Sequence, residues 1–354
     1  MPVELRIEFF DDDHVMRCAR LLLDGGLERP DDRRWLEAFF APASIDEDRI
    51  RAITAGLTEA AVLPPGSDGA RTNVLLFRRG AISRDVLDAR PELRLVQRLG
   101  EGHRTIDVAA AGARSIEIAC VRRATLDAVA EHTLASILAL VKRLPEADRA
   151  VRTWSGGEGM PVDGTRYNWA DLRDVRQLRG ATHGIVGLGE IGVLVARLAH
   201  AFGMRVLYAT RTRRDDDAPF ATPVDLPTLL SEADVISLHA PGDAGTQVID
   251  AAAVAAMKPG AFFVNTARGN LVDEDALYDA LVSGRLAGAA LDVHATEPRP
   301  AGDRFCTLDT VILTPHVAAG SSRAGVLDEL ALLFDNVRAV AAGSPPPHGR
   351  VATA

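Results

Sequence analysis

The sequence is poor in cysteine, in aromatic side chains and in positive charge. Its 354 residues include three cysteines, Cys18, Cys120 and Cys306, which lie too far apart to suggest a disulfide framework or a metal cluster. We therefore expect a reducing, cytoplasmic location and no metal site. The formal charge of −9 argues against a nucleic-acid partner, since a nucleic-acid-binding protein carries a basic stripe.

Long apolar runs are absent as well. The longest candidate, TLASILALV at 133–141, has charged or polar neighbours on both sides and is too short to span a membrane. The N-terminal MPVELRIEFFDDDH lacks the basic-then-apolar pattern of a signal peptide. We therefore expect no membrane partner. The length predicts two domains, and a content of 47% hydrophobic and 25% charged residues is typical of a globular protein.

Short apolar, β-rich runs alternate with helical stretches from about residue 184 onward. Alternation of this kind predicts βαβ units and a parallel sheet that is buried on both faces. Six strands suit a doubly wound, Rossmann-like dinucleotide fold. The expected strands are GIVGLG at 184–189, RVLYAT at 205–210, DVISLHA at 234–240, AFFVNTA at 261–267, GAALDV at 288–293 and TVILTPH at 310–316.

The part before residue 125 predicts a smaller α/β domain. Its expected strands are 6–10, 73–77, 93–100 and 115–121, whereas the acidic segment 11–61 shows no clear pattern. We expect SGGEGMPVDG at 155–164 to be a loop and PPPHG at 345–349 to end the regular structure. A helix over 126–144 would cross into the larger domain, and a helix over 321–342 would return the chain. The smaller domain is therefore predicted at 1–125 and 317–354, and the larger one at 126–316.

The motif GLGEIG at 187–192 stands between an expected strand and an expected helix. Gly187 allows a tight turn, Gly189 lets the backbone approach a pyrophosphate, and Gly192 permits close packing of helix and strand. Glu190 and Ile191 open the helix, whose free N–H groups and positive dipole attract phosphates. The motif therefore predicts a dinucleotide site.

Polar side chains follow the carboxyl ends of the predicted strands, where open parallel sheets bind their ligands. Three of these residues are of reactive types: Arg268, Glu297 and His316. A nucleotide and an Arg–Glu–His set at one edge of the sheet suggest hydride transfer assisted by a proton donor. The residues at these ends are Gly187, Thr210, His239–Pro241, Thr266–Arg268, Asp292–Glu297 and His316.

Several segments resemble the D-isomer-specific 2-hydroxyacid dehydrogenases. The resemblance spans about 71–343 and is carried by VAEHTLASILALV, GIVGLGEIG, NTARGNLVDEDAL, LDVHATEP and TPHVAAG; the stretch at 74–102 looks like the substrate domain of phosphoglycerate dehydrogenase-type members. It implies two Rossmann-like domains: a doubly wound cofactor domain, and a smaller, discontinuous, flavodoxin-like substrate domain with the active site in the cleft. Relatives are typically homodimers joined through their cofactor domains.

The resemblance also implies catalytic roles. Arg268 would bind the carboxylate of a 2-oxo acid and polarise its carbonyl, for which a planar, permanently charged guanidinium is suited. His316 would exchange a proton with the carbonyl oxygen. Glu297 would pair with that imidazole, favouring its charged form and fixing its tautomer. Glyoxylate, hydroxypyruvate and phosphoglycerate types head the list of expected substrates.

Further residues are expected to contact the ligands. Asp292 would accept from the nicotinamide carboxamide or cap a helix, and His239 would shape the cofactor pocket. Arg78 would contact a substrate anion or be merely solvated. The backbone of Leu99, Gly100, Glu101 and Gly102 would hold the substrate carboxylate. The remaining expected cofactor contacts are Pro241, Thr246, Thr266 and Ala267.

The stretch LYATRTRR at 207–214 lacks the acid that usually binds the ribose of NAD. Thr210 stands in its place, so no carboxylate is there to repel the 2′-phosphate of NADP. Arg211, which follows it, supplies a cation that can bind this phosphate. We therefore expect NADP or NAD as cofactor, with NADP favoured. The acidic run Asp215–Asp217, or arginines that are merely solvated, would favour NAD instead.

Two departures from the family pattern leave the substrate open. His103 and Arg104 follow the GEG turn, and Cys120, Arg122 and Arg123 stand where many relatives read Asn, Pro and Gly. Two other functions also stay open. One is a dinucleotide-sensing protein similar to the corepressors of this family, and the other is a formate- or phosphite-type dehydrogenase, against which Glu297 counts.

Overall fold

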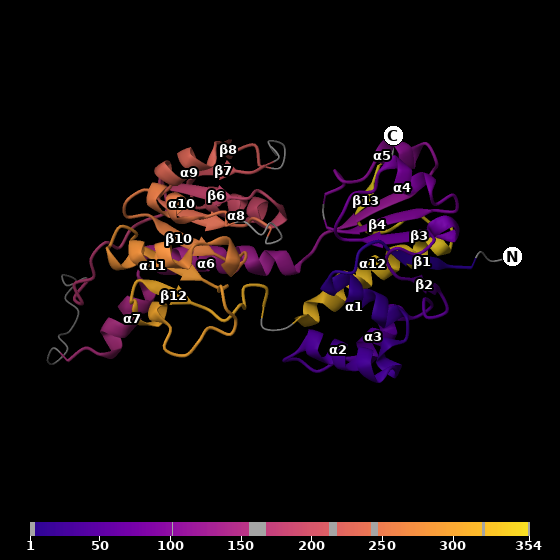
Figure 1. Cartoon of the computed structure of the whole chain (residues 1–354), viewed down its shortest axis with the longest axis horizontal. Helices are drawn as coiled ribbons and strands as arrows, with labels where there is room; N and C mark the ends of the chain where they lie inside the picture. Colours follow the sequence, from indigo (N-terminus) through magenta and orange to yellow (C-terminus); the bar gives the residue numbers. More distant parts are fainter. Residues whose placement is uncertain are drawn as a thin grey trace, which may run out of the picture. The chain divides into compact units, whose positions relative to one another are not determined.

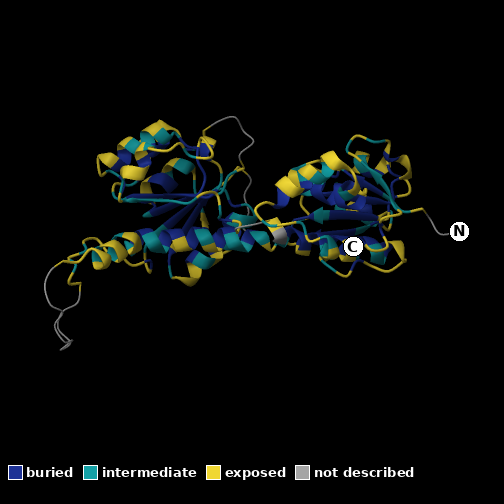
Figure 2. Cartoon of the chain, turned by 90° about the horizontal axis from the view of Figure 1, so that it is seen from below, coloured by how far each residue is buried: buried dark blue, intermediate teal, exposed yellow. Residues whose placement is uncertain are grey.

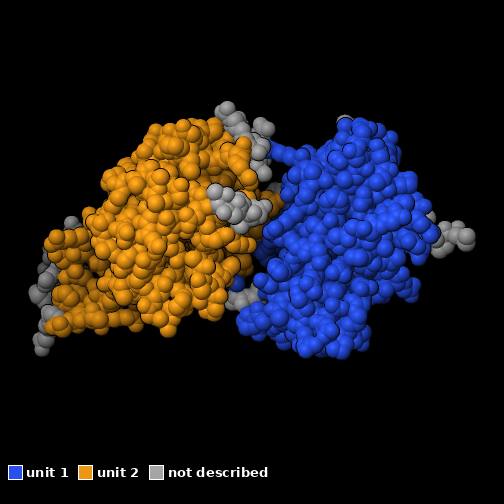
Figure 3. Space-filling view, viewed as in Figure 1, with its two compact units in different colours: residues 1–125, 320–354 blue, residues 126–319 orange. Residues whose placement is uncertain are grey.

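The computed structural model describes residues 4–100, 102–155, 168–211, 218–241, 247–320 and 323–352. The chain divides into two compact units, which Figure 3 colours separately. Unit 1 comprises Met1–Thr125 and Gly320–Ala354, and unit 2 comprises Leu126–Ala319. Each unit has a sheet of its own, and the strands form its buried centre (Figure 2).

Unit 2 contains a seven-stranded sheet in the order β12-β11-β10-β9-β6-β7-β8 (Figure 1). Every pairing in it is parallel, so the prediction of a doubly wound parallel sheet is confirmed. Six strands were expected, and the short β8 is the seventh. The strands are β6 Thr182–Val186, β7 Arg205–Ala209, β8 Thr222–Pro223, β9 Val235–Leu238, β10 Phe262–Asn265, β11 Gly288–Leu291 and β12 Val311–Leu313.

Helices cover both faces of this sheet because its central strands are apolar throughout. Strands β9, β10 and β11 are buried at every position, as expected of parallel strands between two helical layers. One core joins α6 (Thr125–Val141) and α8 (Glu190–Ala201) to the sheet. The opposite core joins α9 (Leu226–Glu232), α10 (Ala251–Ala256) and α11 (Glu274–Val282) to it.

The helix expected over 126–144 is α6, which ends earlier than expected, and α7, which was not expected, follows it. Helix α6 ends at Val141, Arg143 is left-handed with φ 53°, and α7 then runs over Leu144–Arg152. Pro145 explains the break, because its ring would clash with the carbonyl of the residue four positions earlier in a continuous helix. Pro145 is instead placed in the first turn of α7, where a missing N–H does no harm.

Unit 1 contains a six-stranded sheet in the order β13-β5-β4-β3-β1-β2. The order 2-1-3-4-5 of its parallel strands is that of flavodoxin-like folds, as predicted. Helices α1, α2, α3 and α12 pack on one face, and α4 and α5 pack on the other. The strands are β1 Arg6–Phe9, β2 Ala61–Leu63, β3 Val74–Phe77, β4 Leu95–Leu99, β5 Glu117–Val121 and β13 Arg350–Val351.

Two expectations for unit 1 were incomplete or wrong. The segment 11–61 forms α1 (His14–Leu23), α2 (Pro30–Phe40) and α3 (Glu47–Thr54). The PPPHG stretch does not end the regular structure, because β13 follows it and pairs antiparallel with β5. The other helices are α4 Arg84–Asp88, α5 Val108–Gly112 and α12 Val326–Ala341. Across the described parts of the chain, no helix combines the length and hydropathy that a membrane crossing requires.

Candidate active site

The strand order of unit 2 reverses between β6 and β9, and the GLGEIG turn lies at the ends of these two strands. A Cβ added to Gly187 would stand 2.8 Å from backbone atoms of His239 and Ala240, which follow β9. A Cβ added to Gly192 would stand 2.3 Å from the carbonyl oxygen of Gly187. The turn therefore fits only without side chains, and it brings the start of α8 against the end of β6.

The start of α8 is open. Gly189 is its N-cap and offers no side chain to the first N–H groups of this 12-residue helix. A Cβ on Gly189 would meet no atom within 4 Å. Free N–H groups at the positive end of a helix dipole, with open space before them, suit the pyrophosphate of a dinucleotide. Glu190 and Ile191, predicted to contact the cofactor, are the first two residues of this helix.

Strand β7 pairs with β6 on the side opposite β9, and Thr210 and Arg211 follow it. Both residues are exposed. The end of β7 therefore presents a hydroxyl and a guanidinium where a carboxylate would bind a ribose. Arg213, Arg214 and Asp215–Asp217 lie outside the described residues, as does Thr246.

Three polar side chains meet at the turn between β6 and β9: His183 and Ser237, which are buried, and His239, which is half-buried. The Ser237 hydroxyl lies 2.9 Å from Nε2 of His183 and 2.9 Å from Nε2 of His239. Burial lowers the pKa of His183 to about 4, and burial together with His183 lowers the pKa of His239 to about 3. Both imidazoles are therefore neutral at physiological pH. His239 supports the cofactor turn through its backbone, and Pro241 beyond it is exposed.

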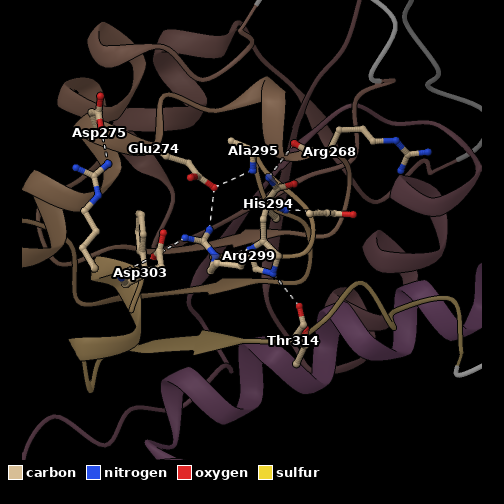
Figure 4. Close-up of polar contacts among 12 residues, drawn as sticks. Arg268, Glu274, Asp275, His294, Ala295, Arg299, Asp303 and Thr314 are labelled. Carbon is tan, nitrogen blue, oxygen red and sulfur yellow. Dashed lines mark hydrogen bonds and ion pairs between the residues drawn. The ribbon is translucent and has the colours of Figure 1, made fainter. Parts of the chain in front are cut away.

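The segment after β10 presents Arg268 to solvent. The Asn265 side chain accepts from the Ala267 N–H at 3.0 Å and donates to the Arg268 carbonyl at 3.0 Å, which fixes the turn. The Arg268 guanidinium donates to the Ala267 carbonyl at 2.6 Å and makes no ion pair with any described residue. Thr266 faces inward, and its hydroxyl lies 3.0 Å from that of Thr133 on α6. Arg268 is thus an anchored cation whose guanidinium extends outward (Figure 4).

Glu297 and His316 form a hydrogen-bonded pair. The Glu297 Oε2 lies 2.8 Å from Nδ1 of His316, and the two side chains are 38% and 46% exposed. The other oxygen, Oε1, accepts from the backbone N–H of His294 at 3.0 Å. Burial raises the pKa of Glu297, but the hydrogen bonds from His316 and His294 outweigh it and leave that pKa below its ordinary value. Glu297 is therefore a carboxylate, and His316 carries a proton on Nδ1.

Asp292 holds the turn that carries His316. This carboxylate is 2% exposed and accepts from the N–H groups of Val317 and Ala318, both at 2.9 Å. Its backbone carbonyl accepts from the His316 N–H at 2.8 Å, and His316 itself is left-handed with φ 56°. A left-handed histidine is uncommon and costs on the order of 1 kcal/mol, so the turn depends on these bonds.

Neighbouring residues complete the support of this turn. The Thr314 hydroxyl donates to Asp292 at 2.7 Å and lies 3.3 Å from Nε2 of His132 on α6. His132 therefore contacts the segment that carries His316. The predicted contact of Asp292 with a nicotinamide carboxamide stays a prediction.

The predicted substrate residues of unit 1 follow β3 and β4, which are parallel neighbours. Leu99 is buried at the end of β4, and Gly100 leaves the strand at φ 153°. The Arg98 guanidinium donates to the Gly102 carbonyl and fixes this turn. Arg78 forms an ion pair with Asp13, so its charge is already partnered. Glu101 lies outside the described residues.

Comparison with known proteins shows which family the chain belongs to. The family model described as the NAD-binding domain of D-isomer-specific 2-hydroxyacid dehydrogenases matches residues 134–318, more than half of the chain. The chain belongs to this family. As a D-2-hydroxyacid dehydrogenase it is an oxidoreductase that acts on the CH–OH group of donors with a nicotinamide dinucleotide.

The curated relatives of this dehydrogenase include glyoxylate reductases. That of Thermofilum pendens is 38% identical over 75% of this chain and 77% of its own length. That of Korarchaeum cryptofilum is 37% identical over 75% of this chain and 79% of its own length. A solved D-lactate dehydrogenase of Aquifex aeolicus, complexed with NAD and lactic acid, is 27% identical, with a TM-score of 0.53 over 84% of this chain and 94% of that chain.

The structure also shows supporting residues that the sequence did not single out. His294, Arg299 and Glu274 form a network (Figure 4). The backbone N–H of His294 joins this network to Glu297. A histidine and an arginine on either side of a glutamate, in HATEPR, were the signal available in the sequence. Their contacts depend on loop conformation, which no periodicity predicts.

Proposed function

We propose that this dehydrogenase interconverts a small 2-oxo acid and the corresponding D-2-hydroxy acid through Arg268, Glu297 and His316. The hydrogen bond of 2.8 Å between Glu297 and His316 carries the proposal. The three residues follow β10, β11 and β12, which are adjacent in the sheet, so their loops share one edge. Relatives named glyoxylate reductase support a substrate of the glyoxylate, hydroxypyruvate or phosphoglycerate type.

The proposed roles in proton transfer follow from which ring nitrogen of His316 is engaged by Glu297. When bound, the dinucleotide supplies or accepts the hydride at the carbonyl carbon. Glu297 engages Nδ1 of His316, so Nε2 is the ring atom left to deliver a proton to the carbonyl oxygen during reduction and to remove it during oxidation. The Glu297 carboxylate stabilises the imidazolium that reduction consumes and oxidation produces. The planar guanidinium of Arg268 binds the substrate carboxylate.

Substrate binding is assigned to unit 1 and cofactor binding to unit 2, which corresponds to domains at 1–125 and 317–354 and at 126–316. In unit 1 the backbone of Leu99–Gly102 is proposed to bind the carboxylate. A substrate contact by Arg78 would require its guanidinium to share or exchange its ion pair with Asp13.

NADP is the proposed cofactor rather than NAD. Support comes from the end of β7, where the exposed Thr210 and Arg211 replace the expected carboxylate. A guanidinium can pair with a 2′-phosphate, whereas a carboxylate would repel it.

The proposed partner is a second copy of the chain, bound through unit 2. Helix α7 has no buried residue, and large apolar side chains are exposed on it and after it. Trp154 and Trp169 pack edge to face at 4.8 Å and remain accessible. Exposed apolar patches with tryptophan are typical of interfaces. Of the seven large exposed apolar side chains among the described residues, five lie in this region: Leu144, Val151, Trp154, Trp169 and Val175. None of the three cysteines, all of which lie among the described residues, forms a disulfide, and the cytoplasmic location stays a prediction.

A substrate panel tests the proposed function. Purified protein is mixed with NADPH or NADH and glyoxylate, hydroxypyruvate or phosphohydroxypyruvate, and the loss of reduced nicotinamide is followed. Oxidation with at least one 2-oxo acid is expected. Tight cofactor binding without any turnover would instead support the dinucleotide-sensing alternative. A second assay with NADP+ or NAD+ and formate or phosphite tests the other alternative, which formation of reduced nicotinamide from these donors alone would support. The Glu297–His316 bond argues against the formate-type enzyme.

A further inference from the structure

Arg299 lies just beyond Glu297 and is nearly enclosed, with a side chain 10% exposed. Its guanidinium donates to Glu274 Oε1 at 2.9 Å and to Asp303 Oδ1 at 2.6 Å. The guanidinium carbon lies 5.0 Å from the centre of the Phe305 ring. The two carboxylates, which Figure 4 shows beside Arg299, and the aromatic face of Phe305 therefore fix the plane of this cation.

The third bond of the same guanidinium is to a histidine. Nε of Arg299 donates to Nδ1 of His294 at 2.9 Å. Because arginine has no acceptor, Nδ1 of His294 must carry a lone pair, and the ring proton must sit on Nε2. That Nε2–H donates to the Thr314 carbonyl at 3.0 Å. Arg299 thus sets the tautomer and the direction of His294.

His294 touches every segment that carries the proposed catalytic residues. Its backbone N–H holds Glu297 Oε1, and its ring holds Thr314, two residues before His316. Its backbone also lies against Gly269, where an added Cβ would stand 2.0 Å from the His294 carbonyl carbon. Gly269 directly follows Arg268, so a displacement of His294 would disturb all three segments.

Glu274 adds a second link from Arg299 to the Glu297 loop. Its Oε1 accepts from Arg299 and from the backbone N–H of Ala295 at 3.1 Å. The loop from His294 to Glu297 is therefore held at two successive N–H groups, one by Glu297 itself and one by Glu274.

We propose that Arg299, acting through His294, is a positioning residue that keeps Glu297 aligned on Nδ1 of His316. This role rests on the proposed function, in which His316 exchanges the proton. Arg299 touches neither His316 nor Arg268 among its described contacts, so its effect is transmitted by His294 and Glu274.

The test compares Arg299→Met with Arg304→Met as a matched control. Arg304 lies on the same segment, and its guanidinium stands over Phe305 and Tyr278 and pairs with Asp275, away from His294. The readouts are kcat against pH, KM for the 2-oxo acid, cofactor affinity by fluorescence and the NMR titration of the His316 imidazole in histidine-labelled protein.

For Arg299→Met we expect kcat to fall roughly 10- to 100-fold, because a small misplacement of an acid–base pair is costly. The His316 titration should differ from that of the parent, in the direction of lower pH, since a loosely held carboxylate stabilises the imidazolium less. Cofactor affinity should stay unchanged, and Arg304→Met should match the parent protein in every readout. An Arg299→Met variant that loses thermal stability but keeps the kcat and His316 titration of the control would overturn the proposal.

A second variant covers the case in which Arg299→Met fails to fold. His294→Phe removes both ring bonds and keeps the backbone N–H to Glu297, and it should reproduce the shifted titration. Where both single variants fold, the double variant should be little worse than either, because residues that act through one another are not additive. Full additivity would overturn the relay through His294. The NMR titration requires no turnover, so a protein inert toward every 2-oxo acid would refute the proposed function while the titration still decides the role of Arg299.

Discussion

Glu297 and His316 meet across two loops that follow different strands, with 2.8 Å between Oε2 and Nδ1. The Glu297 carboxylate is held at its other oxygen by the His294 N–H, and the His316 turn is held by Asp292. The other ring nitrogen of His316, Nε2, makes no hydrogen bond to any residue that the structure describes. This relationship is the centre of the proposed acid–base chemistry.

Removing the charge of Glu297 should lower turnover without loss of fold. Glu297→Gln keeps the size of the side chain but no longer stabilises the imidazolium, so we expect kcat to fall roughly 10- to 10³-fold. Rates of 2-oxo acid reduction should fall most at high pH, where the protonated ring becomes scarce. Glu232→Gln, which alters an exposed ion pair with Arg205, is the control. Equal rates for both variants across the pH range would count against the pair.

Cofactor choice should respond to a carboxylate at the end of β7. Thr210→Asp should lower kcat/KM for NADPH relative to NADH by roughly 10- to 100-fold, because Asp repels a 2′-phosphate and accepts from a 2′-hydroxyl. Arg197→Ala, which removes an exposed arginine of α8, should leave the ratio unchanged. A parent protein that already prefers NADH would show that Arg211 does not bind the phosphate.

The buried carboxylate of Asp292 should matter for both stability and turnover. In Asp292→Asn one of the N–H groups of Val317 and Ala318 faces an amide N–H instead of an oxygen. We expect the free energy of unfolding to fall by about 1–3 kcal/mol and kcat to fall as the His316 turn moves. Asp225→Asn at the start of α9 should be nearly neutral, since Asn also caps helices. Denaturant unfolding measures the loss of stability, and initial rates measure the loss of turnover. Equal stability of Asp292→Asn and Asp225→Asn would refute the supporting role of Asp292.

The neutral His183 should make the protein sensitive to mild acid. Burial holds its folded pKa at about 4, below the ordinary 6.5, so as pH falls below 6.5 the unfolded chain takes up the proton first. Stability present above pH 6.5 is therefore lost as the pH falls toward 4, by about 3 kcal/mol at full extent.

His183→Leu should shrink the difference in unfolding free energy between pH 7 and pH 5 by about 2 kcal/mol. His200→Gln, on α8 beside Phe220, serves as the comparison. If both variants show the pH slope of the parent, the buried histidine is not the source of the acid sensitivity.

Much of the fold could be predicted because parallel strands buried on both faces give continuous apolar runs. Six strands of unit 2 follow from such runs and from the GLGEIG turn, whereas the flavodoxin-like order of unit 1 was expected from the family resemblance alone. Helices α1 and α3 were missed although Asp13 and Asp46 cap them, because these acids stand among other acids and the cap is not distinguishable in the sequence. Helix α7 was missed because its segment, LPEADRAVR, is polar and buries no residue, so it shows no apolar pattern of a packed helix.

The proposed catalytic residues were accessible from sequence because Arg268, Glu297 and His316 each follow a strand that the sequence predicts. The residues that support them could not be predicted from the sequence. His294, Arg299 and Thr314 come together only through the conformation of two loops, and the left-handed turn at His316 depends on a buried carboxylate 24 residues earlier. Contacts of this kind follow from tertiary structure and have no periodic signature.

The most direct test of the account is the turnover of His316→Gln beside the parent protein, with NADPH and the best 2-oxo acid of the panel under conditions where both bind cofactor equally. If Nε2 of His316 delivers the proton, kcat should fall roughly 10²- to 10⁴-fold while cofactor affinity is retained. A variant that keeps near-parental kcat would contradict the assignment of His316 and with it the proposed mechanism.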